Sequence, residues 1–539
     1  MISEQELEAL LQQLNHQKRS WIQVDLQARI LLLQQCLHLI SVHAQDWVAQ
    51  ACQIKKIDPH SNRAAEEWLT GPMSLCRYLR LLMDSLQQIQ RPLPTATAVN
   101  GQATVGVFPS SFLESLLWPG FRAEIWIDPK YPPSRGESYR HFPDQGAVTL
   151  VLGAGNVTSL APCDALHQLL VEQSVTLLKL NPCLQELESC FKTILHPLIQ
   201  AGFLAIVAGD ADRGQWLSQH PLVERIHLTG SSKTYAMLQR QVSAFSPPKP
   251  ITAELGCVTP ILVVPGAWTA QDLSYQARQI ASALTYNGGF NCNTPQVLIT
   301  SREWPLRQEL LNRLQQELEQ ISPYHPLIPG AEIRQQQFRA HYPQAQALGP
   351  VSSGGLPWVL IRDLSPSPEE FALQTEAFCG VLAEVSLPTR NASSFLQEAV
   401  AFVNDHVWGT LSCMILIDPQ TSRSLKSQLQ QAIADLRYGG IAINCWSAVL
   451  YSLMTTTWGA FPREDPRNEI SSGNGWVHNT FLLDHPQKSI VYAPWRLPFT
   501  PPWFSDHRQA RTMAQLLTDF EAQPGWLKLP SIWTLALKG

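Results

Sequence analysis

The chain has 539 residues, of which 45% are hydrophobic and 15% are charged, and its net charge is -5 at pH 7. This length exceeds what one hydrophobic core can organise, so we expect two or three domains. The mild negative charge argues against a nucleic-acid partner. The eleven cysteines include no C-x-x-C pair. That pattern argues against a disulfide framework, a zinc ribbon or another metal centre, and it predicts a reducing, cytoplasmic compartment.

The N-terminal region, residues 4–90, is expected to be helical. Its opening, MISEQELEALLQQLNHQ, is acidic and lacks the pattern of a signal peptide. The later stretch LQARILLLQQCLHLI repeats leucine and isoleucine at helical spacing. Residues 91–142 are rich in proline and glycine and contain one alternating stretch, RAEIWIDP, which predicts a strand.

From Gly146 onward the sequence alternates between short apolar strands and helices. The strands AVTLVL, VTLLKL, AIVAG and RIHLTG come first, and a second series begins after Glu254 with TPILVVP and QVLIT and continues to about residue 446. Short apolar runs separated by helical segments are typical of βαβ units around a buried parallel sheet. We therefore expect an α/β fold with two tandem lobes.

An uncharged run over residues 438–462 is long enough to cross a bilayer. It carries Asn444, Ser447, Ser452 and three consecutive threonines, however, and the apolar sequence is not continuous. A buried strand followed by a loop fits this composition better, so no membrane span is expected.

Two glycine-containing turns are candidates for binding phosphate. The first, LVLGAGNVTS, places Gly153 and Gly155 between a strand and a helix, but Thr158 stands at the third glycine position of the dinucleotide fingerprint. Glycine is also common in any tight strand-to-helix turn. The second, HLTGSS, places Gly230 and Ser231 where a helix begins, which suits either phosphate binding or a simple N-cap.

Cys292 differs from the other cysteines in its surroundings. It follows the turn YNGGFN, in which small residues allow close backbone approach to a ligand and amides supply hydrogen-bond donors. A nucleophilic thiol must be partly ionised, so its surroundings are expected to favour the anion. No histidine is placed to pair with it, which argues against a papain-like site.

Six stretches, taken in order, resemble the motif series of the aldehyde dehydrogenase superfamily. GAGN, LLKLNP, LTGSS, ELGCVTP, YNGGFNC and EAFCGV are similar to that family's P-W-N, L-K-P-x-E, F-T-G-S-T, E-L-G-G-x-x-P, F-x-x-G-Q-x-C and E-x-F-G-P-V segments. The step of 23 residues from Asn156 to Lys179 also matches. The resemblance covers roughly residues 145–450.

The resemblance implies a role for each matching residue. Cys292 would be the nucleophile, Glu254 the base that activates water, and Asn156 a side-chain oxyanion donor beside the backbone N–H of Cys292. Without the resemblance, Glu254 and Lys179 would be interpreted as ordinary charged residues at the ends of secondary-structure elements. The implied binding residues for NAD or NADP are Lys179 and Glu376 at the two riboses, Phe378 beside the nicotinamide, Ser231 at the pyrophosphate, and Gly153, Gly155, Gly230 and Pro182 in the surrounding wall.

Several positions depart from the family pattern. The family's tryptophan before the asparagine is Gly155, its glutamine two residues before the cysteine is Phe290, and Cys257 and Cys379 replace two glycines. Pro182 stands where NAD-preferring members carry a carboxylate, so tolerance of NADP is expected. The family's C-terminal segment, which often contacts substrate, is replaced by TTTWGAFPRED. The sequence therefore predicts a divergent member and does not identify the aldehyde.

The implied organisation has three parts. Residues 1–253 would hold the N-terminal helices and the NAD(P)-binding domain, interrupted at about 103–140 by a β extension that joins subunits. Residues 254–450 would form the catalytic domain, and 451–539 would supply the substrate loop, a second strand of the extension near 487–495, and a tail. A homodimer or homotetramer is the implied assembly.

The expected activity is NAD(P)-dependent oxidation of an aldehyde to a carboxylic acid through a thiohemiacetal and a thioester on the cysteine. Two alternatives remain. A relative that passes the acyl group to coenzyme A, or runs in reverse as an acyl-CoA reductase, generally lacks the glutamate base. A catalytically silent member with a binding or structural role would not need to retain the whole set of motif residues.

Overall fold

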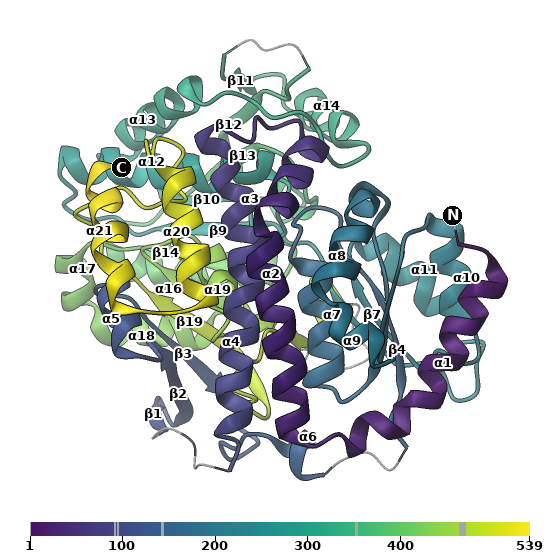
Figure 1. Cartoon of the computed structure of the whole chain (residues 1–539). Coiled ribbons are helices and arrows are strands. Elements are labelled where there is room, and N and C mark those ends of the chain that lie inside the picture. The colour runs from purple at the N-terminus through teal and green to yellow at the C-terminus, as the bar shows by residue number, and fades with distance from the viewer. Residues whose placement is uncertain (1, 91–92, 94–95, 142–144, 351–353, 463–469) are drawn as a thin grey trace.

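The computed structural model describes residues 2–90, 93, 96–141, 145–350, 354–462 and 470–539. Two sheets dominate the fold, one of six strands and one of eleven. Long N-terminal helices run beside the smaller sheet, and the C-terminal helices return to lie against them (Figure 1). The structure is thus an α/β protein with two sheets, as the alternation of strands and helices predicts.

The N-terminal helices begin with α1 (Glu4–Gln23), where Ser3 and Glu6 form a reciprocal capping box. The helix α2 (Leu26–Lys55) follows and packs against α4 (Ser74–Gln87). Between them, α3 (Ala65–Trp68) continues into a π-helical turn, η2 (Leu69–Met73), which contains Pro72 and a non-helical Gly71. A proline removes one helical N–H, and a wider turn at this point accommodates the interruption.

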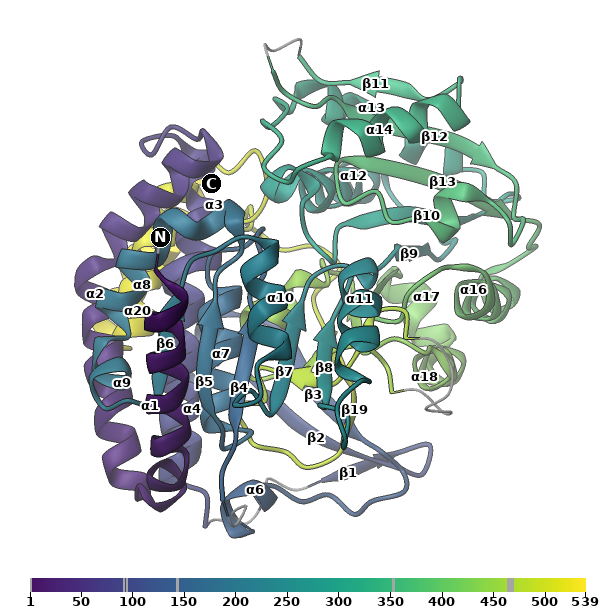
Figure 2. The ribbon, with the colours of Figure 1, turned by 90° about the vertical axis from the view of Figure 1, so that its right-hand side faces the viewer.

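The six-stranded sheet has the order β17-β8-β7-β4-β5-β6. All neighbours pair in parallel except β17, which is antiparallel to β8. The strands are β4 (Val148–Leu152), β5 (Val175–Lys179), β6 (Leu204–Val207), β7 (Arg225–Thr229), β8 (Ile251–Glu254) and β17 (Gly473–Asn474). The sheet separates α7 (Leu160–Leu170) from α1, α10 (Ala211–Gln219) and α11 (Ser232–Val242) (Figure 2). Helices on both faces explain why its strands are continuously apolar.

The eleven-stranded sheet has the order β1-β2-β3-β19-β15-β14-β9-β10-β13-β12-β11. From β19 to β12 the strands pair in parallel, whereas both ends of the sheet are antiparallel. The parallel strands are β9 (Thr259–Val263), β10 (Pro295–Ser301), β12 (Trp358–Leu364), β13 (Val381–Leu387), β14 (Ser412–Leu416), β15 (Gly440–Ile443) and β19 (Pro486–Tyr492), and the antiparallel edge strand beside β12 is β11 (Gln346–Leu348). The helices that accompany them include α12 (Ala270–Thr285), α13 (Arg307–Gln320), α14 (Ala331–His341), α16 (Ala392–His406), α17 (Pro419–Ser424), α18 (Lys426–Asp435) and α19 (Ala448–Leu453).

The β extension is continuous with this larger sheet. Its strands β1 (Thr97–Val99), β2 (Gln102–Phe108) and β3 (Arg122–Ile127) lead to β19, which is antiparallel to β3 and parallel to β15. The pairing expected between the strand near residues 122–128 and a C-terminal strand is therefore present, with Ile125 opposite Ser489.

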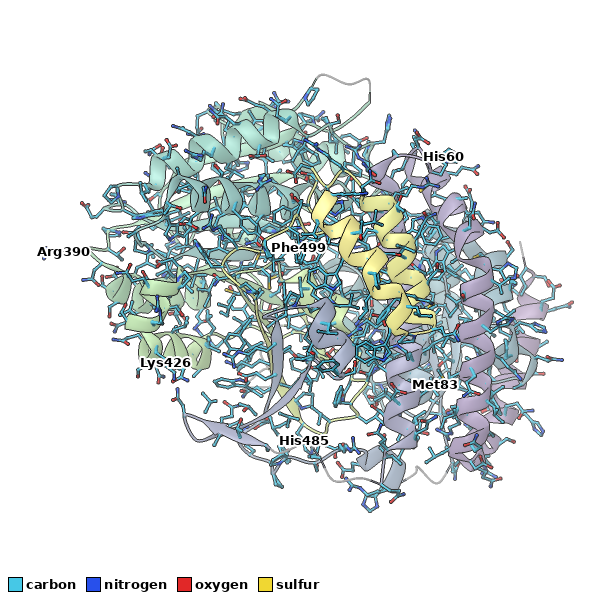
Figure 3. The ribbon with its side chains drawn as sticks, turned by 60° about the vertical axis from the view of Figure 1, so that its left-hand side comes forward. His60, Met83, Arg390, Lys426, His485 and Phe499 are labelled. Atoms are coloured by element: carbon cyan, nitrogen blue, oxygen red, sulfur yellow. The ribbon has the colours of Figure 1, made fainter. Side chains whose placement is uncertain are left out.

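The chain ends in two helices, α20 (Ala510–Ala522) and α21 (Leu529–Lys538), which build a small separate core with residues such as Met513, Phe520 and Ile532. Figure 3 shows these helices lying against the N-terminal ones, and α20 contacts α3, η2 and α4. Within the described ranges, no helix is both long and apolar enough to cross a membrane. The run over residues 438–462 forms β15, α19 and the short β16 (Trp458–Gly459) instead.

Candidate active site

Cys292 and Glu254 lie in direct contact. Glu254 is the last residue of β8, and Cys292 follows the short turn η4 (Tyr286–Gly289) at the end of α12. The thiol of Cys292 donates a hydrogen bond of 3.1 Å to Oε1 of Glu254. The end of a strand in the smaller sheet and the turn that precedes β10 of the larger sheet thus bring these two residues together in the geometry of an acid and its acceptor.

Burial changes the proton affinity of both groups. Loss of solvent raises the pKa of the Cys292 thiol well above its ordinary value, and the neighbouring carboxylate of Glu254 raises it further. Burial also raises the pKa of Glu254 to about 7, and the charge of Asp164 adds to this effect. The expectation that the surroundings favour a thiolate is therefore wrong for this state, since a buried anion beside a carboxylate is costly. Instead the proton stays on sulfur, next to a carboxylate placed to receive it.

Asn156 holds the loop that precedes the cysteine. It follows β4, is buried, and donates from Nδ2 to the carbonyl oxygen of Phe290 at 2.8 Å. A side-chain amide carries two N–H groups, so one remains for a second acceptor while the first fixes the orientation. The arrangement therefore presents a fixed amide beside the loop of Cys292.

A cavity of about 840 Å³ connects this pair with the carboxyl ends of the smaller sheet's strands. Ligands in α/β proteins commonly bind at this edge of a parallel sheet. All eleven residues that the sequence singled out line this one cavity: Gly153, Gly155, Asn156, Lys179, Pro182, Gly230, Ser231, Glu254, Cys292, Glu376 and Phe378. Residues that lie up to more than two hundred positions apart in the sequence therefore line the same cavity.

The glycines of the cavity wall allow close packing. A Cβ added to Gly153 would lie 2.6 Å from the Cβ of Ala161, and one added to Gly155 would lie 2.6 Å from the side chain of Asn181. Both distances are shorter than real Cβ contacts, so the turn after β4 requires glycine at both positions. Here the glycines serve packing at the cavity wall.

Lys179 and Ser231 lie toward the end of the cavity formed by the smaller sheet. Lys179 ends β5 and is buried, and its ammonium has no hydrogen-bond partner among the described residues. Burial lowers the pKa of Lys179 to about 8, and Asp210 opposes this shift. Ser231 caps α11 by accepting the N–H of Thr234, which leaves the helix start facing the cavity. A partnerless cation and a helix N-terminus both suit an anionic ligand.

Glu376 and Phe378 lie near the cysteine. Oε1 of Glu376 accepts the backbone N–H of Cys257 at 3.0 Å, and burial raises the pKa of Glu376 to about 7. A Cβ on Gly256 would overlap this carboxylate, so glycine is required beside it. The ring of Phe378 lies 6.5 Å from that of Phe290. This segment therefore joins the wall of the cavity to the loop of Cys292.

Sequence reasoning missed two residues of this site. Arg334, on α14, donates to the carbonyl oxygens of Ala377 and Phe378 at 2.9 and 3.4 Å and also lines the cavity. Asp164, on α7, is fully buried and accepts the hydroxyl of Thr229 at 2.7 Å. Neither lies in a recognisable motif. The expected substrate loop lies partly outside the described residues, which omit 463–469.

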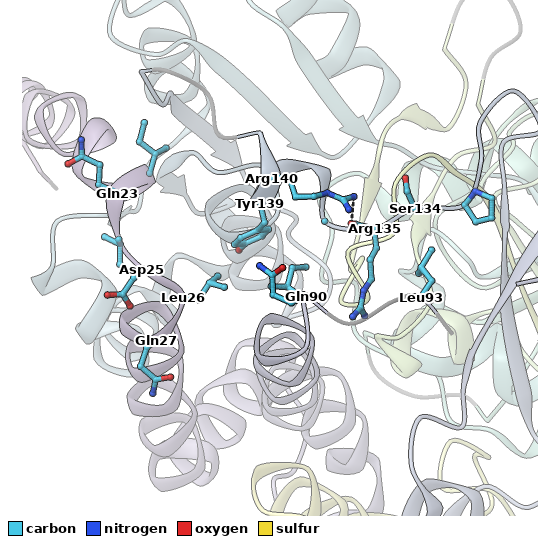
Figure 4. A pocket seen from close by; sticks show the side chains of 15 residues that line it. Gln23, Asp25, Leu26, Gln27, Gln90, Leu93, Ser134, Arg135, Tyr139 and Arg140 are labelled. Carbon is cyan, nitrogen blue, oxygen red and sulfur yellow. Dashed lines mark hydrogen bonds between the residues drawn. The ribbon is translucent and has the colours of Figure 1, made fainter. Parts of the chain in front are cut away.

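A second cavity, of about 960 Å³, lies between the α1–α2 junction and the segment around α6 (Glu137–Arg140) (Figure 4). Asp25, Arg135, Tyr139 and Arg140 contribute to its lining, and it contains none of the residues that the sequence singled out. In the described part of the chain, no group of three or more histidine, cysteine, aspartate or glutamate side chains could hold a metal ion.

Comparison with known proteins gives consistent relatives. The sequence model of the aldehyde dehydrogenase family matches residues 182–345. The aminoacetaldehyde dehydrogenase of Pseudomonas aeruginosa is 27% identical over 267 residues, which cover 46% of this chain and 49% of that protein. The chain thus spans about half the length of the curated relative that it matches.

Known structures resemble the whole fold. The γ-glutamyl-γ-aminobutyraldehyde dehydrogenase of Burkholderia cenocepacia has a TM-score of 0.63 at 16% identity, covering 91% of this chain and 89% of that one. The NADP-dependent glyceraldehyde-3-phosphate dehydrogenase of Bacillus halodurans, complexed with NADP, has a TM-score of 0.60 at 16% identity, covering 91% of each chain. The two sheets and the cavity between them are therefore the aldehyde dehydrogenase fold. Residues 182–345 thus resemble the aldehyde dehydrogenase family in sequence, and the chain resembles its solved members in fold.

Proposed function

We propose that the protein oxidises an aldehyde to a carboxylic acid, with NAD or NADP as hydride acceptor and Cys292 as nucleophile. The observation that carries this proposal is the 3.1 Å contact between the Cys292 thiol and Glu254 at one end of the cavity. A nucleophile, a base and a side-chain amide donor lie within one enclosed site, which is the arrangement that acyl chemistry requires.

The cavity suits a dinucleotide in its charge and shape. The ammonium of Lys179 would meet ribose hydroxyls, the start of α11 at Ser231 would meet the pyrophosphate, and Glu376 would accept the hydroxyls of the second ribose. Phe378 would pack beside the nicotinamide. A bound nicotinamide would take up the hydride that leaves the substrate carbon. Because Pro182 carries no charge, nothing at that position repels the 2′-phosphate of NADP.

In the first step, the sulfur of Cys292 attacks the aldehyde carbonyl carbon while its proton passes to Oε1 of Glu254. The S–C bond forms and the carbonyl π bond breaks, which leaves a negative charge on the oxygen of a thiohemiacetal. The free N–H of Asn156 and the backbone N–H of Cys292 would stabilise that oxyanion. The carboxylate of Glu254 must be ionised to accept the proton, and a pKa of about 7 permits this at neutral pH.

In the second part of the reaction, loss of hydride leaves a thioester on Cys292. Glu254, having released its proton to solvent, takes one from water, and the hydroxide adds to the thioester carbonyl carbon. The C–S bond then breaks and the sulfur takes the proton back from Glu254, which frees the acid. Coenzyme A would need no such base because its own thiol is the nucleophile. The buried carboxylate beside the sulfur therefore favours hydrolysis over transfer to coenzyme A.

The Glu254→Gln variant tests this assignment. Because Glu254 also accepts the thiol proton in the first step, the burst of reduced cofactor, near one per active site, should form more slowly than in the wild type, and the turnover that follows should be slower still because the thioester persists. The wild type should form free acid with no need for coenzyme A. Acyl-CoA formation that depends on added coenzyme A would replace this proposal by the acyl-transfer alternative.

The proposed assembly is a homodimer or homotetramer joined through the β extension. The strand β1 ends the larger sheet and would be available to a neighbour, as edge strands are. Light scattering on the purified protein should give two or four times the chain mass of 60.3 kDa. A monomer at micromolar concentration would rule this assembly out.

A further inference from the structure

Asn287 connects the N-terminal helices to the catalytic loop. This residue lies in η4, five positions before Cys292, and is buried with a left-handed backbone at φ 54°. Asparagine is one of the few residues with a side chain that adopts this conformation readily. Its amide therefore points into the protein from a turn whose shape is already specified.

The amide of Asn287 joins three segments. Its Nδ2 donates to the carbonyl oxygen of Asn156 at 3.1 Å, to that of Phe290 at 3.4 Å, and to Oδ1 of Asn291 at 3.0 Å. The carbonyl of Phe290 is the one that Asn156 also holds. One side chain thus ties the backbone of the proposed oxyanion donor to both residues that immediately precede Cys292.

The other end of the same amide is anchored by a buried ion pair. Nζ of Lys55 donates to Oδ1 of Asn287 at 2.9 Å and to Oε1 of Glu67 at 2.7 Å, and both charged side chains are almost fully buried. The backbone N–H of Asn287 donates to Oε2 of Glu66 at 2.8 Å. Lys55 ends α2 and the two glutamates belong to α3, more than two hundred residues from the turn.

A buried ion pair of this kind is not explained by stability alone. Desolvation of the two charges offsets much of their attraction, so such pairs often add little to folding free energy. Such pairs do fix the orientation of hydrogen-bond donors, because a lysine held by a carboxylate offers its remaining N–H groups at fixed angles. Here one of the two remaining donors of Lys55 points at the amide that organises the catalytic loop.

We propose that Asn287, held by the Lys55–Glu67 ion pair, is a positioning residue that fixes Cys292 and Asn156 relative to each other. In this view the N-terminal helices form part of the catalytic apparatus although none of the residues that line the cavity belongs to them. A displacement of reacting groups by about 1 Å can cost about 100-fold in rate, so a positioning residue can matter as much as a catalytic one.

The test compares Asn287→Gly with Lys55→Met in the full-length protein. Glycine keeps the left-handed turn and removes only the amide. Lys55→Met keeps the amide and removes its anchor. The matched control is Lys249→Met, which deletes a buried lysine that donates to the carbonyl oxygens of Ser218 and His220, outside the site.

Two readouts are measured for each variant: kcat with the best aldehyde, and the rate at which iodoacetamide alkylates each cysteine, followed by peptide mass spectrometry. Release of the loop should lower kcat by about 10- to 100-fold. It should also speed alkylation of Cys292, because the thiol leaves its buried contact with Glu254. The buried Cys76 and Cys445 should react as slowly as in the wild type, and cofactor affinity should stay within about threefold.

The kcat readout rests on the proposed function, whereas the alkylation readout does not, so the two can fail separately. The positioning role is supported, even if no aldehyde is oxidised, when iodoacetamide alkylates Cys292 alone faster in both variants and does not do so in Lys249→Met. Unchanged alkylation of Cys292 in Asn287→Gly overturns it, and so does a parallel increase at all cysteines, which would mean general loosening. If Asn287→Gly fails to fold, Lys55→Met alone decides between the same two results.

Discussion

At the scale of single residues, the proposed chemistry depends on a proton shared between sulfur and carboxylate. Burial raises the pKa of the Cys292 thiol, so the thiol does not ionise readily on its own. Burial also raises the pKa of Glu254 to about 7, where this carboxylate can both accept and release a proton near neutral pH. The same carboxylate can therefore serve the attack by sulfur and the later attack by water. In the proposed mechanism Glu254 thus fills two successive roles, and neither step requires a histidine.

The pH dependence of turnover should follow Glu254. Below a pKa of about 7, the ionised fraction of this carboxylate falls about tenfold per pH unit, so kcat should fall as the pH drops from 7.5 to 5.5. Glu376 has a pKa of about 7 as well, but it would act on cofactor affinity, so KM for the cofactor separates the two groups. Measurement of kcat at saturating cofactor checks this, and a flat profile across that range would contradict it.

Asn156 should contribute through its second N–H group. Asn156→Ala removes one oxyanion donor, and the loss of one donor typically lowers kcat by about 100- to 1000-fold. Steady-state kinetics with the wild-type aldehyde measures the effect, and the cofactor dissociation constant serves as the internal control. Weaker substrate binding at an unchanged kcat would mean that Asn156 only shapes the turn and the Phe290 carbonyl.

At the scale of elements, β19 ties the β extension to the larger sheet. Its Lys488 is buried and donates to the carbonyl oxygens of Ile433, Ala434 and Leu436 at 3.0, 2.8 and 2.7 Å. These carbonyls lie at the C-terminal end of α18, where a cation also interacts favourably with the helix dipole. One side chain thus secures a helix end against the strand that joins two parts of the sheet.

Lys488→Met should leave these carbonyls without a partner and so reduce the free energy of unfolding by roughly 2–4 kcal/mol, given that each buried unpaired group costs about 1–3 kcal/mol. Urea unfolding followed by tryptophan fluorescence measures the change. Lys426→Met, at the exposed start of the same helix, is the control and should change stability by less than about 0.5 kcal/mol. Equal effects of the two substitutions would show that the carbonyl contacts carry little free energy.

The strands and the cysteine turn could be predicted because their signals are local. AVTLVL and VTLLKL are apolar runs that form β4 and β5, and the order of the family-like motifs predicts that Glu254 and Cys292 lie in one site, where the two side chains are in contact. Other features depend on residues far apart in the chain. The pairing of β17 with β8, the contact of Asp164 with Thr229, and the raised pKa of Cys292 all arise from tertiary packing, which no periodicity encodes.

At the scale of the whole molecule, the C-terminal helices pack against the layer formed by α2, α3 and α4. Arg77 of α4 donates to Glu521 of α20 at 2.8 Å and pairs with Glu114 of α5 (Phe112–Leu117) at 2.7 Å, and all three side chains are buried. The C-terminal helices therefore pack against the N-terminal helices, which include the ones that carry Lys55 and Glu67. The cavity, the catalytic loop and this layer form one connected unit.

The central claim is that Cys292 carries the acyl group on its way to free acid. The most direct measurement follows reduced cofactor and acid together, with a panel of aldehydes and NAD or NADP, for the wild type and Cys292→Ala. We predict one acid and one reduced cofactor per aldehyde in the wild type, and no detectable oxidation in Cys292→Ala although it binds cofactor normally. Substantial aldehyde oxidation by Cys292→Ala would contradict the account.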